Sequence, residues 1–282
     1  MIKLGKCVIF VSKIIDEVEN KTSKKYHIGI ALSGGGARGF AHVGALKALE
    51  EVGIKPDILA GVSAGSIVSA LYSAGISPEK IHDLFEGVKF NDLCELSVPK
   101  DGFFKLDKFK RFLRKNIAYN NIEELPIPTY ICATDLDEGI PVAFDSGSIA
   151  ERVVASCSIP IVFKPVKIGS HYYVDGGVLH NLPAWPLRDI CEYVIGINCS
   201  PLVNTKMQHT IIDVAQRSFD LMARTNANSD MEKCDLVIQT VNIAQHNVFN
   251  LKDTNSVQKS GYKITKEIIA NNIDLIERMK NR

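Results

Sequence analysis

A serine flanked by two glycines is the first feature of this sequence with the residue types and spacing for chemistry. Gly61-Val62-Ser63-Ala64-Gly65 has the G-x-S-x-G spacing of a nucleophile elbow, in which the glycines make room for a strained strand-to-helix turn that exposes the serine hydroxyl. A hydroxyl presented in this way can attack a carbonyl carbon once a base removes its proton. The short pattern also arises by chance, so the surrounding sequence must show whether it marks a nucleophile. It predicts Ser63 as a nucleophile, with Gly61 and Gly65 shaping the turn.

A glycine-rich loop about 25 residues earlier offers groups that could stabilise a negative charge. The loop Ser33-Gly34-Gly35-Gly36-Ala37-Arg38-Gly39 follows an apolar run and opens a helical pattern. Backbone N–H groups at the start of a helix are free to bind an anion, so the loop fits an oxyanion hole for chemistry at Ser63. The residues that we expect to form it are Gly34, Gly35, Gly36, Arg38 and Gly39. The Arg38 side chain could either contact a phosphate head group or brace the loop by pairing with a carboxylate.

Two other interpretations of the glycine loop compete with an oxyanion hole. Gly34, Gly36 and Gly39 satisfy the G-x-G-x-x-G pattern of dinucleotide sites. In those sites an acidic residue ends the second strand and binds the ribose, whereas Asp57 precedes that strand here. A phosphate-binding P-loop would continue with Gly-Lys-Ser/Thr, and this chain does not. A glycine turn with a purely structural role remains the second alternative.

A serine hydroxyl needs a base, and Asp175 is the best candidate. In Tyr172-Tyr173-Val174-Asp175-Gly176-Gly177-Val178 the carboxylate ends an apolar strand, and Gly176 and Gly177 allow a sharp turn and a close approach of substrate. An Asp-Gly pair more commonly marks an ordinary turn. A solvated carboxylate is too weak a base at neutral pH, so Asp175 can act only if it is partly desolvated and hydrogen-bonded to Ser63.

Taken together and in this order, the glycine loop, the elbow and the Asp turn resemble the patatin-like phospholipase family. The resemblance spans residues 28 to about 200, and it includes Ala155-Ser156-Cys157-Ser158-Ile159-Pro160, Phe163-Lys164-Pro165 and Asn181-Leu182-Pro183. It implies a serine lipid acyl hydrolase without a cofactor, in which Ser63 attacks an ester carbonyl and Asp175 takes its proton. The loop of Gly34, Gly35, Gly36 and Arg38 would hold the oxyanion, and the substrate would be a lipid or another acyl ester.

Short apolar runs that alternate with helical patterns predict the elements that position these residues. Strand patterns occur at 28–32, 58–60, 129–133, 193–197 and 236–239, and helical patterns at 40–52, 64–75, 148–157, 209–230 and 256–280. This alternation predicts a single-domain, three-layer α/β/α fold with a largely parallel central sheet. Residues 166–174 predict a hairpin that turns at Gly169-Ser170. We expect a polar N-terminal lead at 1–25, a catalytic core at 26–205, and a C-terminal α/β extension of the same domain at 206–282.

The composition is that of an ordinary soluble protein. Because 33 Lys and Arg face 32 Asp and Glu, the formal net charge is +1, so nucleic acid is not expected as a partner and any membrane contact must be local. Seven scattered cysteines without a C-x-x-C spacing predict reduced thiols. The apolar runs are too short for a signal peptide or a spanning helix. A cytoplasmic location is therefore expected, with peripheral contact at the membrane as an option.

Three further features are better explained by structure than by chemistry. His42 lies in the first turns of the helix after the glycine loop, where a packed, hydrogen-bonded role is expected. The stretch from Lys100 to Lys115 mixes basic residues with four phenylalanines, which fits a solvated helix with Phe turned to the core better than a lipid interface. Asp135 and Asp137, with a glycine close behind, fit a turn better than a metal site.

Two alternative functions would keep the same residues. An acyltransferase would use the same dyad and differ only in how water is excluded, so the sequence does not separate it from a hydrolase. A non-catalytic lipid-binding module would keep the fold without turnover, and the intact Ser63 and Asp175 argue against it. A catalytic triad would need His180, His209 or His246 as its base, whereas a dyad needs none of them. The sequence leaves the head group, the acyl chain length and the oligomeric state open.

Overall fold

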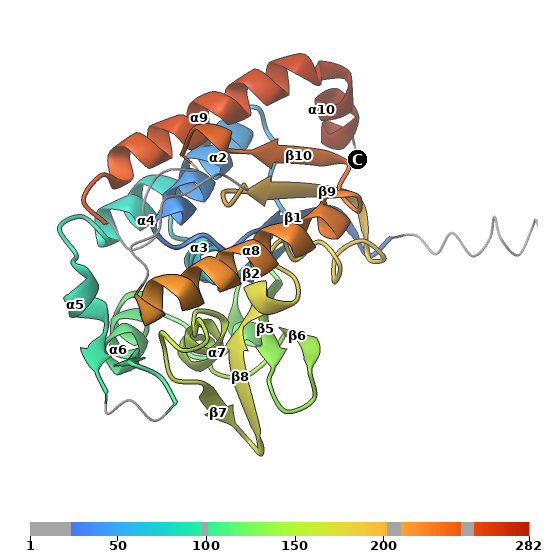
Figure 1. Ribbon diagram of the computed structural model, residues 1–282. Coiled ribbons are helices and arrows are strands. Elements are labelled where there is room, and N and C mark those ends of the chain that lie inside the picture. The colour runs from blue at the N-terminus through green and yellow to red at the C-terminus, as the bar shows by residue number, and fades with distance from the viewer. Residues whose placement is uncertain (1–23, 98–100, 202–209, 244–250, 282) are drawn as a thin grey trace, which may run out of the picture.

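A mixed, mostly parallel sheet forms the centre of the molecule (Figure 1). A computed structural model describes residues 24–97, 101–201, 210–243 and 251–281. Within them eight strands form this sheet in the order β10-β9-β1-β2-β5-β8-β7, with β6 paired to β5. The parallel strands are β1 (Tyr26–Leu32), β2 (Ile58–Val62), β5 (Thr129–Asp135), β9 (Cys191–Asn198) and β10 (Leu236–Gln239). The antiparallel pairings involve β6 (Ile140–Phe144), β7 (Val166–Ile168) and β8 (His171–Asp175).

Alternating side chains of the strands pack into two separate cores, one on each face of the sheet. In β1, Ile30 and Leu32 belong to the larger core, while Ala31 between them belongs to the smaller one. This alternation follows from the two-residue repeat of a strand. The parallel strands are buried on both faces, as β2 is over its whole length. The predicted α/β fold with three layers is therefore confirmed.

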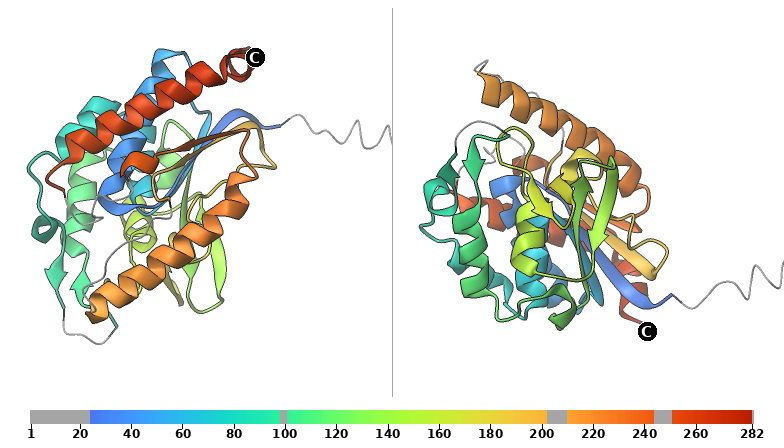
Figure 2. Two further views of the ribbon diagram at one scale, coloured as in Figure 1. Left: turned by 45° about the horizontal axis from the view of Figure 1, so that its top comes forward. Right: turned by 90° about the horizontal axis from the view of Figure 1, so that it is seen from below.

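The two helical layers are very unequal (Figure 2). On the face of the larger core lie α2 (Phe40–Glu51), α3 (Ala64–Ser73), α4 (Pro78–Leu84), α6 (Asp107–Asn116), α7 (Ile149–Ser156), α9 (Thr254–Asn271) and α10 (Ile273–Lys280). The opposite face is covered by α8 (Ile211–Met231) and the segment that carries Leu182 and Leu187. Between α4 and α6 the chain forms α5 (Phe90–Leu93) and a small hairpin of β3 (Glu95–Leu96) and β4 (Phe104–Lys105). No helix of the described segments is long and apolar enough to cross a membrane.

Most of the predicted elements are present. The helical pattern at 256–280 is divided into α9 and α10, because the backbone of Asn272 leaves the helical region and its side chain caps α9 by donating to the Ile268 carbonyl at 2.8 Å. Strands β3, β4 and β6 and helices α4 and α5 have no counterpart in the prediction. The hairpin at 166–174 is present and turns at Gly169 with φ 63°. The proposed division into three regions stays a prediction, and residues 1–23 of its lead lie outside the described part.

Candidate active site

Ser63 occupies the sharp turn between β2 and α3. Its backbone has φ 51° and ψ −121°, a region that a residue with a side chain enters only at a cost. Gly61 and Gly65 permit this turn, because a Cβ atom on Gly61 would lie 2.5 Å from the Gly65 carbonyl oxygen and one on Gly65 would collide with the Leu32 carbonyl of β1. The side chain of Ser63 is 9% exposed and lines a pocket. The strained backbone therefore orients the Ser63 hydroxyl toward the pocket.

Asp175 ends β8 and is completely buried. Its Oδ1 accepts the Gly177 N–H at 2.9 Å, and its own N–H donates to the Ser158 carbonyl at 2.9 Å. Burial raises its pKa to about 7, against the lowering effects of the Ser63 hydroxyl and the Gly177 N–H. Its Oδ2 has no hydrogen bond of standard geometry to the described residues. The Ser63 hydroxyl is nevertheless near enough to lower the pKa of the carboxyl.

The glycine loop lies beside Ser63, and its amides differ in availability. A Cβ on Gly34 would lie 3.2 Å from that of Ser63, so the loop passes directly over the nucleophile. The Gly34 N–H is already used, because it donates to the Asn181 carbonyl at 3.1 Å. The N–H groups of Gly35 and Gly36 make no hydrogen bond within the described segments. Of the three glycines, these two carry donors free to bind an anion.

Arg38 lies under the glycine loop and is 1% exposed. Its Nε approaches the Gly35 carbonyl at 3.4 Å. Burial lowers the pKa of the guanidinium, and the charge of Asp220 on α8 acts in the opposite direction. Of the two roles considered for Arg38, this placement favours bracing the loop over contact with a head group. Gly39 packs the end of the loop against α3, since a Cβ there would lie 2.6 Å from that of Ala64.

Two residues that received no role from the sequence hold the site together. Ser156 at the end of α7 accepts the Ser63 N–H at 2.8 Å and donates to the Cys132 carbonyl of β5 at 2.6 Å. Asn181 accepts the Gly34 N–H through its carbonyl and donates its own N–H to Asn226 of α8 at 2.8 Å. Both lie in segments that carried the family resemblance. Their signal was a polar residue within an otherwise apolar stretch.

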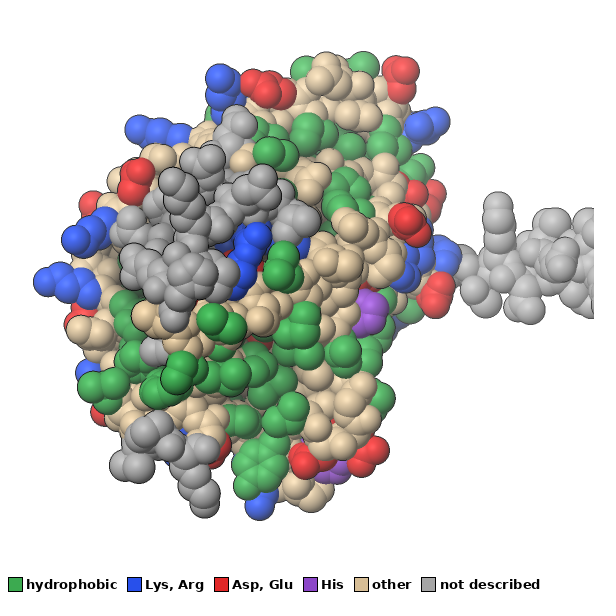
Figure 3. Space-filling view, in the orientation of Figure 1, with side chains coloured by type: hydrophobic (Ala, Val, Ile, Leu, Met, Phe, Trp, Pro, Cys, Tyr) green, Lys and Arg blue, Asp and Glu red, His purple; other side chains and the backbone are tan. Residues whose placement is uncertain are grey.

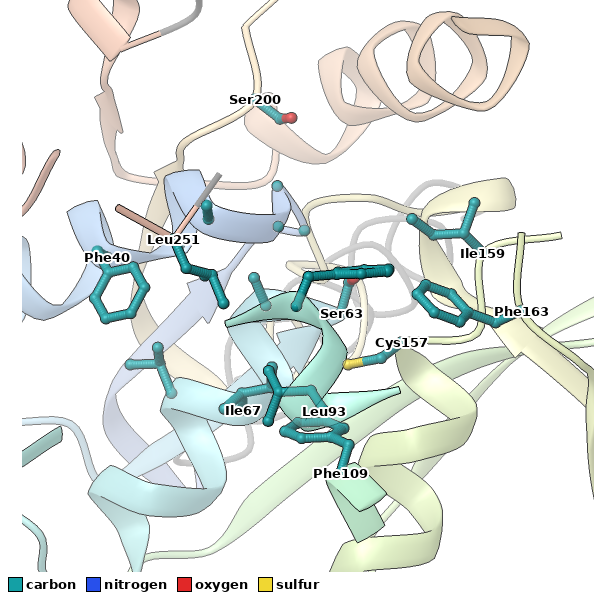
Figure 4. Close-up of a pocket in the computed structure, with 18 of the residues that line it drawn as sticks. Phe40, Ser63, Ile67, Leu93, Phe109, Cys157, Ile159, Phe163, Ser200 and Leu251 are labelled. Carbon is teal, nitrogen blue, oxygen red and sulfur yellow. The ribbon is translucent and has the colours of Figure 1, made fainter. Parts of the chain in front are cut away.

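The pocket that opens onto Ser63 is lined almost entirely by apolar side chains (Figure 4). Figure 4 shows the serine among residues of α3, α5, α6 and the segment after α7, namely Ile67, Leu93, Phe109, Cys157, Ile159 and Phe163. Residues of α8, including Phe219 and Ala223, complete its wall. The pocket therefore suits a hydrocarbon chain better than a polar ligand.

The histidines are engaged elsewhere or lie outside the description. His42 is fully buried, and its Nε2 lies 2.8 Å from the Ser33 carbonyl, so it packs as expected. His180 turns to α8, where its Nδ1 lies 2.7 Å from Asp230 Oδ2. His209 and His246 fall in segments that are not described. No histidine of the described segments is bonded to Ser63 or Asp175.

Asp135 and Asp137 form the expected turn, whereas the stretch from Lys100 to Lys115 is helical only from Asp107 onward. Asp135 Oδ1 accepts the N–H groups of Asp137 and Glu138 at 2.9 and 3.0 Å, which forms the expected turn. His171 joins this turn through a 2.7 Å contact with Asp135, so the three groups Asp135, Asp137 and His171 lie within 4.8 Å of one another. In α6, Phe109 is buried in the core as expected, but Phe104 of the same stretch belongs to strand β4 and not to a helix. Lys100 itself lies outside the described residues.

Comparison with known proteins agrees with this fold. Residues 30–188 match the model of the patatin-like phospholipase family. The chain therefore belongs to the patatin-like phospholipase family. An uncharacterized NTE family protein of Mycobacterium tuberculosis is 33% identical over 171 residues, which are 60% of this chain and 47% of that protein. Lysophospholipase NTE1 of Kluyveromyces lactis is 30% identical over 197 residues, covering 65% of this chain and 14% of the relative.

The solved structure of VipD from Legionella pneumophila shows the same fold. It has a TM-score of 0.59 and 15% sequence identity, and the match covers 88% of this chain and 67% of that one. At this identity the likeness concerns the fold alone. The chain spans less than half the length of the curated relatives named above.

Proposed function

We propose that this chain is a lipid acyl hydrolase in which Ser63 is the nucleophile and Asp175 its base. The observation that carries the proposal is the pairing of a strained, pocket-facing serine with a fully buried carboxylate whose pKa is raised to about 7. A base with a pKa near the working pH combines a large ionised fraction with enough basicity to take a proton. Membership of the patatin-like phospholipase family supports lipid hydrolysis as the activity.

The reaction follows from the positions of these groups. Ser63 Oγ attacks the ester carbonyl carbon while its proton passes to the Asp175 carboxylate, and the N–H groups of Gly35 and Gly36 stabilise the oxyanion. The intermediate collapses as the C–O bond to the alcohol breaks, and Asp175 returns the proton to the leaving oxygen. Water then attacks the acyl-serine while Asp175 takes its proton. Asp175 gives that proton to Ser63 Oγ as the bond from Oγ to the acyl carbon breaks, and the fatty acid leaves.

The apolar pocket indicates the kind of substrate. An acyl chain placed among Ile67, Leu93 and Phe109 would be shielded from water, and burial of each CH₂ group stabilises binding by about 0.8 kcal/mol. The relative from Kluyveromyces lactis is named a lysophospholipase. We therefore propose phospholipids and lysophospholipids as the substrate class, with the acyl chain rather than the head group held in the pocket.

The test compares the wild-type protein with Ser63→Ala and a matched control, Ser69→Ala. Ser69 is a buried serine of α3, six positions after Ser63, and it does not line the pocket. Each protein is assayed on aryl esters of rising chain length, on mixed phospholipids, and with a fluorophosphonate probe. We expect activity and labelling to disappear in Ser63→Ala alone, and kcat/KM to rise with chain length. Undiminished labelling of Ser63→Ala would overturn the proposal.

A further inference from the structure

Helix α8 exposes none of its charged side chains to the degree that is usual for a surface helix. Its inner face completes the wall of the Ser63 pocket through Phe219 and Ala223. Its five charged residues, Asp213, Arg217, Asp220, Arg224 and Asp230, are all buried or half-buried. A helix on the surface of a globular protein normally turns its charges to solvent and its apolar side chains inward. In α8 the charged groups are thus withdrawn from the outer surface, and Asp213 among them bonds to Thr210 at the start of the helix.

The exposed residues of α8 are all uncharged, among those whose exposure the structure describes. They comprise four large apolar side chains, Ile211, Val214, Leu221 and Met222, which are 73%, 48%, 42% and 45% exposed, and four small polar ones, Ser218, Thr225, Asn228 and Ser229. At 3.6 residues per turn, all eight fall on one face of the helix. Figure 3 shows hydrophobic side chains gathered across this side of the molecule, with most acidic and basic side chains towards its margins.

Two more apolar side chains are exposed next to the pocket in the sequence. Ile161 stands between the pocket residues Ile159 and Phe163, and it is 50% exposed. Its φ of 71° is unusual for a β-branched residue, and its carbonyl is fixed by the Phe103 N–H at 3.2 Å. Leu96 of β3, close behind the pocket residue Leu93, is 80% exposed. Strain that keeps an isoleucine in water suggests a use for its exposure.

We propose that these six apolar side chains dock the protein on a lipid surface with the pocket facing the bilayer. We call them the pocket rim, and they are Leu96, Ile161, Ile211, Val214, Leu221 and Met222. The proposal rests on the proposed function, because a lipid surface is where the substrate lies. The rim and the wall of the pocket share α8 and the 159–163 segment, because Phe219 and Ala223 of α8 and Ile159 and Phe163 line the pocket. Docking through these elements would therefore bring the pocket that holds Ser63 close to the lipid.

The chemistry of the rim also fixes the type of attraction. Its side chains bear no charge, so docking inserts apolar surface and does not depend on anionic lipid. The basic residues of α6, such as Lys108 and Arg111, would instead produce binding that falls with salt, because salt screens surface charges. Salt dependence thus distinguishes the rim from α6.

The experiment measures binding to phosphatidylcholine vesicles by co-sedimentation, in the Ser63→Ala background so that no lipid is consumed. The rim variant is Leu221→Glu with Met222→Glu. The matched control is Ile273→Glu, which changes a side chain of α10 that is 52% exposed and does not line the pocket. We expect the rim variant to lose vesicle affinity by about tenfold or more, and the control to bind like its parent. Binding of the parent should be equal at about 0.1 M and about 0.5 M salt.

A second measurement separates docking from catalysis. With Ser63 present, the rim variant should keep the kcat/KM of the wild type on a soluble short-chain ester but lose most of its activity on vesicle phospholipid. Vesicle binding without hydrolysis of any ester would refute the proposed function and leave the docking surface standing. Equal binding by the rim variant and its parent, or binding lost at the higher salt, would refute the docking surface. So would sedimentation equilibrium that shows a dimer in the parent and a monomer in the rim variant.

Discussion

Replacing Asp175 by Asn should abolish activity and at the same time stabilise the folded protein. The side chain is fully buried, and burial is the main cause that raises its pKa from 3.8 to about 7. Above about pH 7 the folded protein therefore holds an ionised carboxylate away from water, whereas in the unfolded chain the same group is solvated. Asn has nearly the same shape, can still accept the Gly177 N–H, and carries no charge.

The size of the effect follows from the shift in pKa. It amounts to roughly three pKa units, and each unit corresponds to about 1.36 kcal/mol. The stability penalty of the carboxylate is absent below the unfolded pKa, grows as the pH rises, and is complete above about 7, with an upper limit of about 4 kcal/mol. At about 2 °C per kcal/mol for a chain of this size, Asp175→Asn should raise Tm by up to about 8 °C at high pH.

The assay combines thermal unfolding with kinetics on one soluble ester. Tm of the wild type and of Asp175→Asn is measured at about pH 5 and about pH 9, where we expect the gain from Asn to be clearly larger at the higher pH. The kcat/KM of the wild type should rise with pH up to about 7 and then level off, while Asp175→Asn should lose roughly 10³-fold or more. The reasoning fails if Asn gives no larger gain at high pH, or if wild-type kcat/KM does not change across this range.

Three further outcomes are expected. His180→Gln should keep most of the wild-type kcat/KM, because the imidazole is bonded to Asp230 of α8, and a loss as complete as that of Asp175→Asn in a folded protein would indicate a triad. Ser156→Ala should slow fluorophosphonate labelling by about tenfold or more, because it leaves the buried Ser63 N–H without its 2.8 Å acceptor, and labelling at the wild-type rate would exclude a positioning role. A chelator should leave ester hydrolysis unchanged, whereas a loss that calcium restores would reveal a metal site.

The main elements of the fold could be predicted from sequence because their patterns are local. The parallel strands are apolar runs ended by glycine or polar residues, and the helices between them show a clear period. Strand β6 escaped prediction, since none of its five residues is fully buried and its apolar pattern is weak. The break at Asn272 escaped it as well, because an asparagine within an apolar period does not by itself announce a helix end.

The candidate site likewise contains residues that could be predicted from the sequence and residues that could not. Ser63, Asp175 and the glycine loop can be recognised because each lies in one short turn, and the turn requires particular residue types at a fixed spacing. Ser156 and Asn181 are not, because their roles depend on partners 93 and 147 positions away, at Ser63 and Gly34. The difference between the amides of Gly34, Gly35 and Gly36 depends on the same long-range contact. Such contacts exist only once the sheet has brought the strand ends together.

The orientation of α8 could not be predicted from the sequence for a different reason. This orientation connects the candidate site with the exposed surface. Helical period shows that Val214, Leu221 and Met222 share a face, but it does not show which face is inward. The structure gives the cause, because three polar side chains of α8, Asp220, Asn226 and Asp230, act on the site. Asn226 bonds the Gly177 and Val178 carbonyls and the Asn181 N–H.

Two carboxylates of α8 brace the same site. Asp230 Oδ2 lies 2.7 Å from His180 Nδ1. The negative charge of Asp220 acts on the Arg38 guanidinium beneath the glycine loop. A helix that turns Asp220, Asn226 and Asp230 inward, toward the glycine loop and the Asp turn, is left with uncharged residues outside. The apolar outer face of α8 is thus a geometric consequence of how the site is built, and a lipid surface is the environment in which that consequence is favourable.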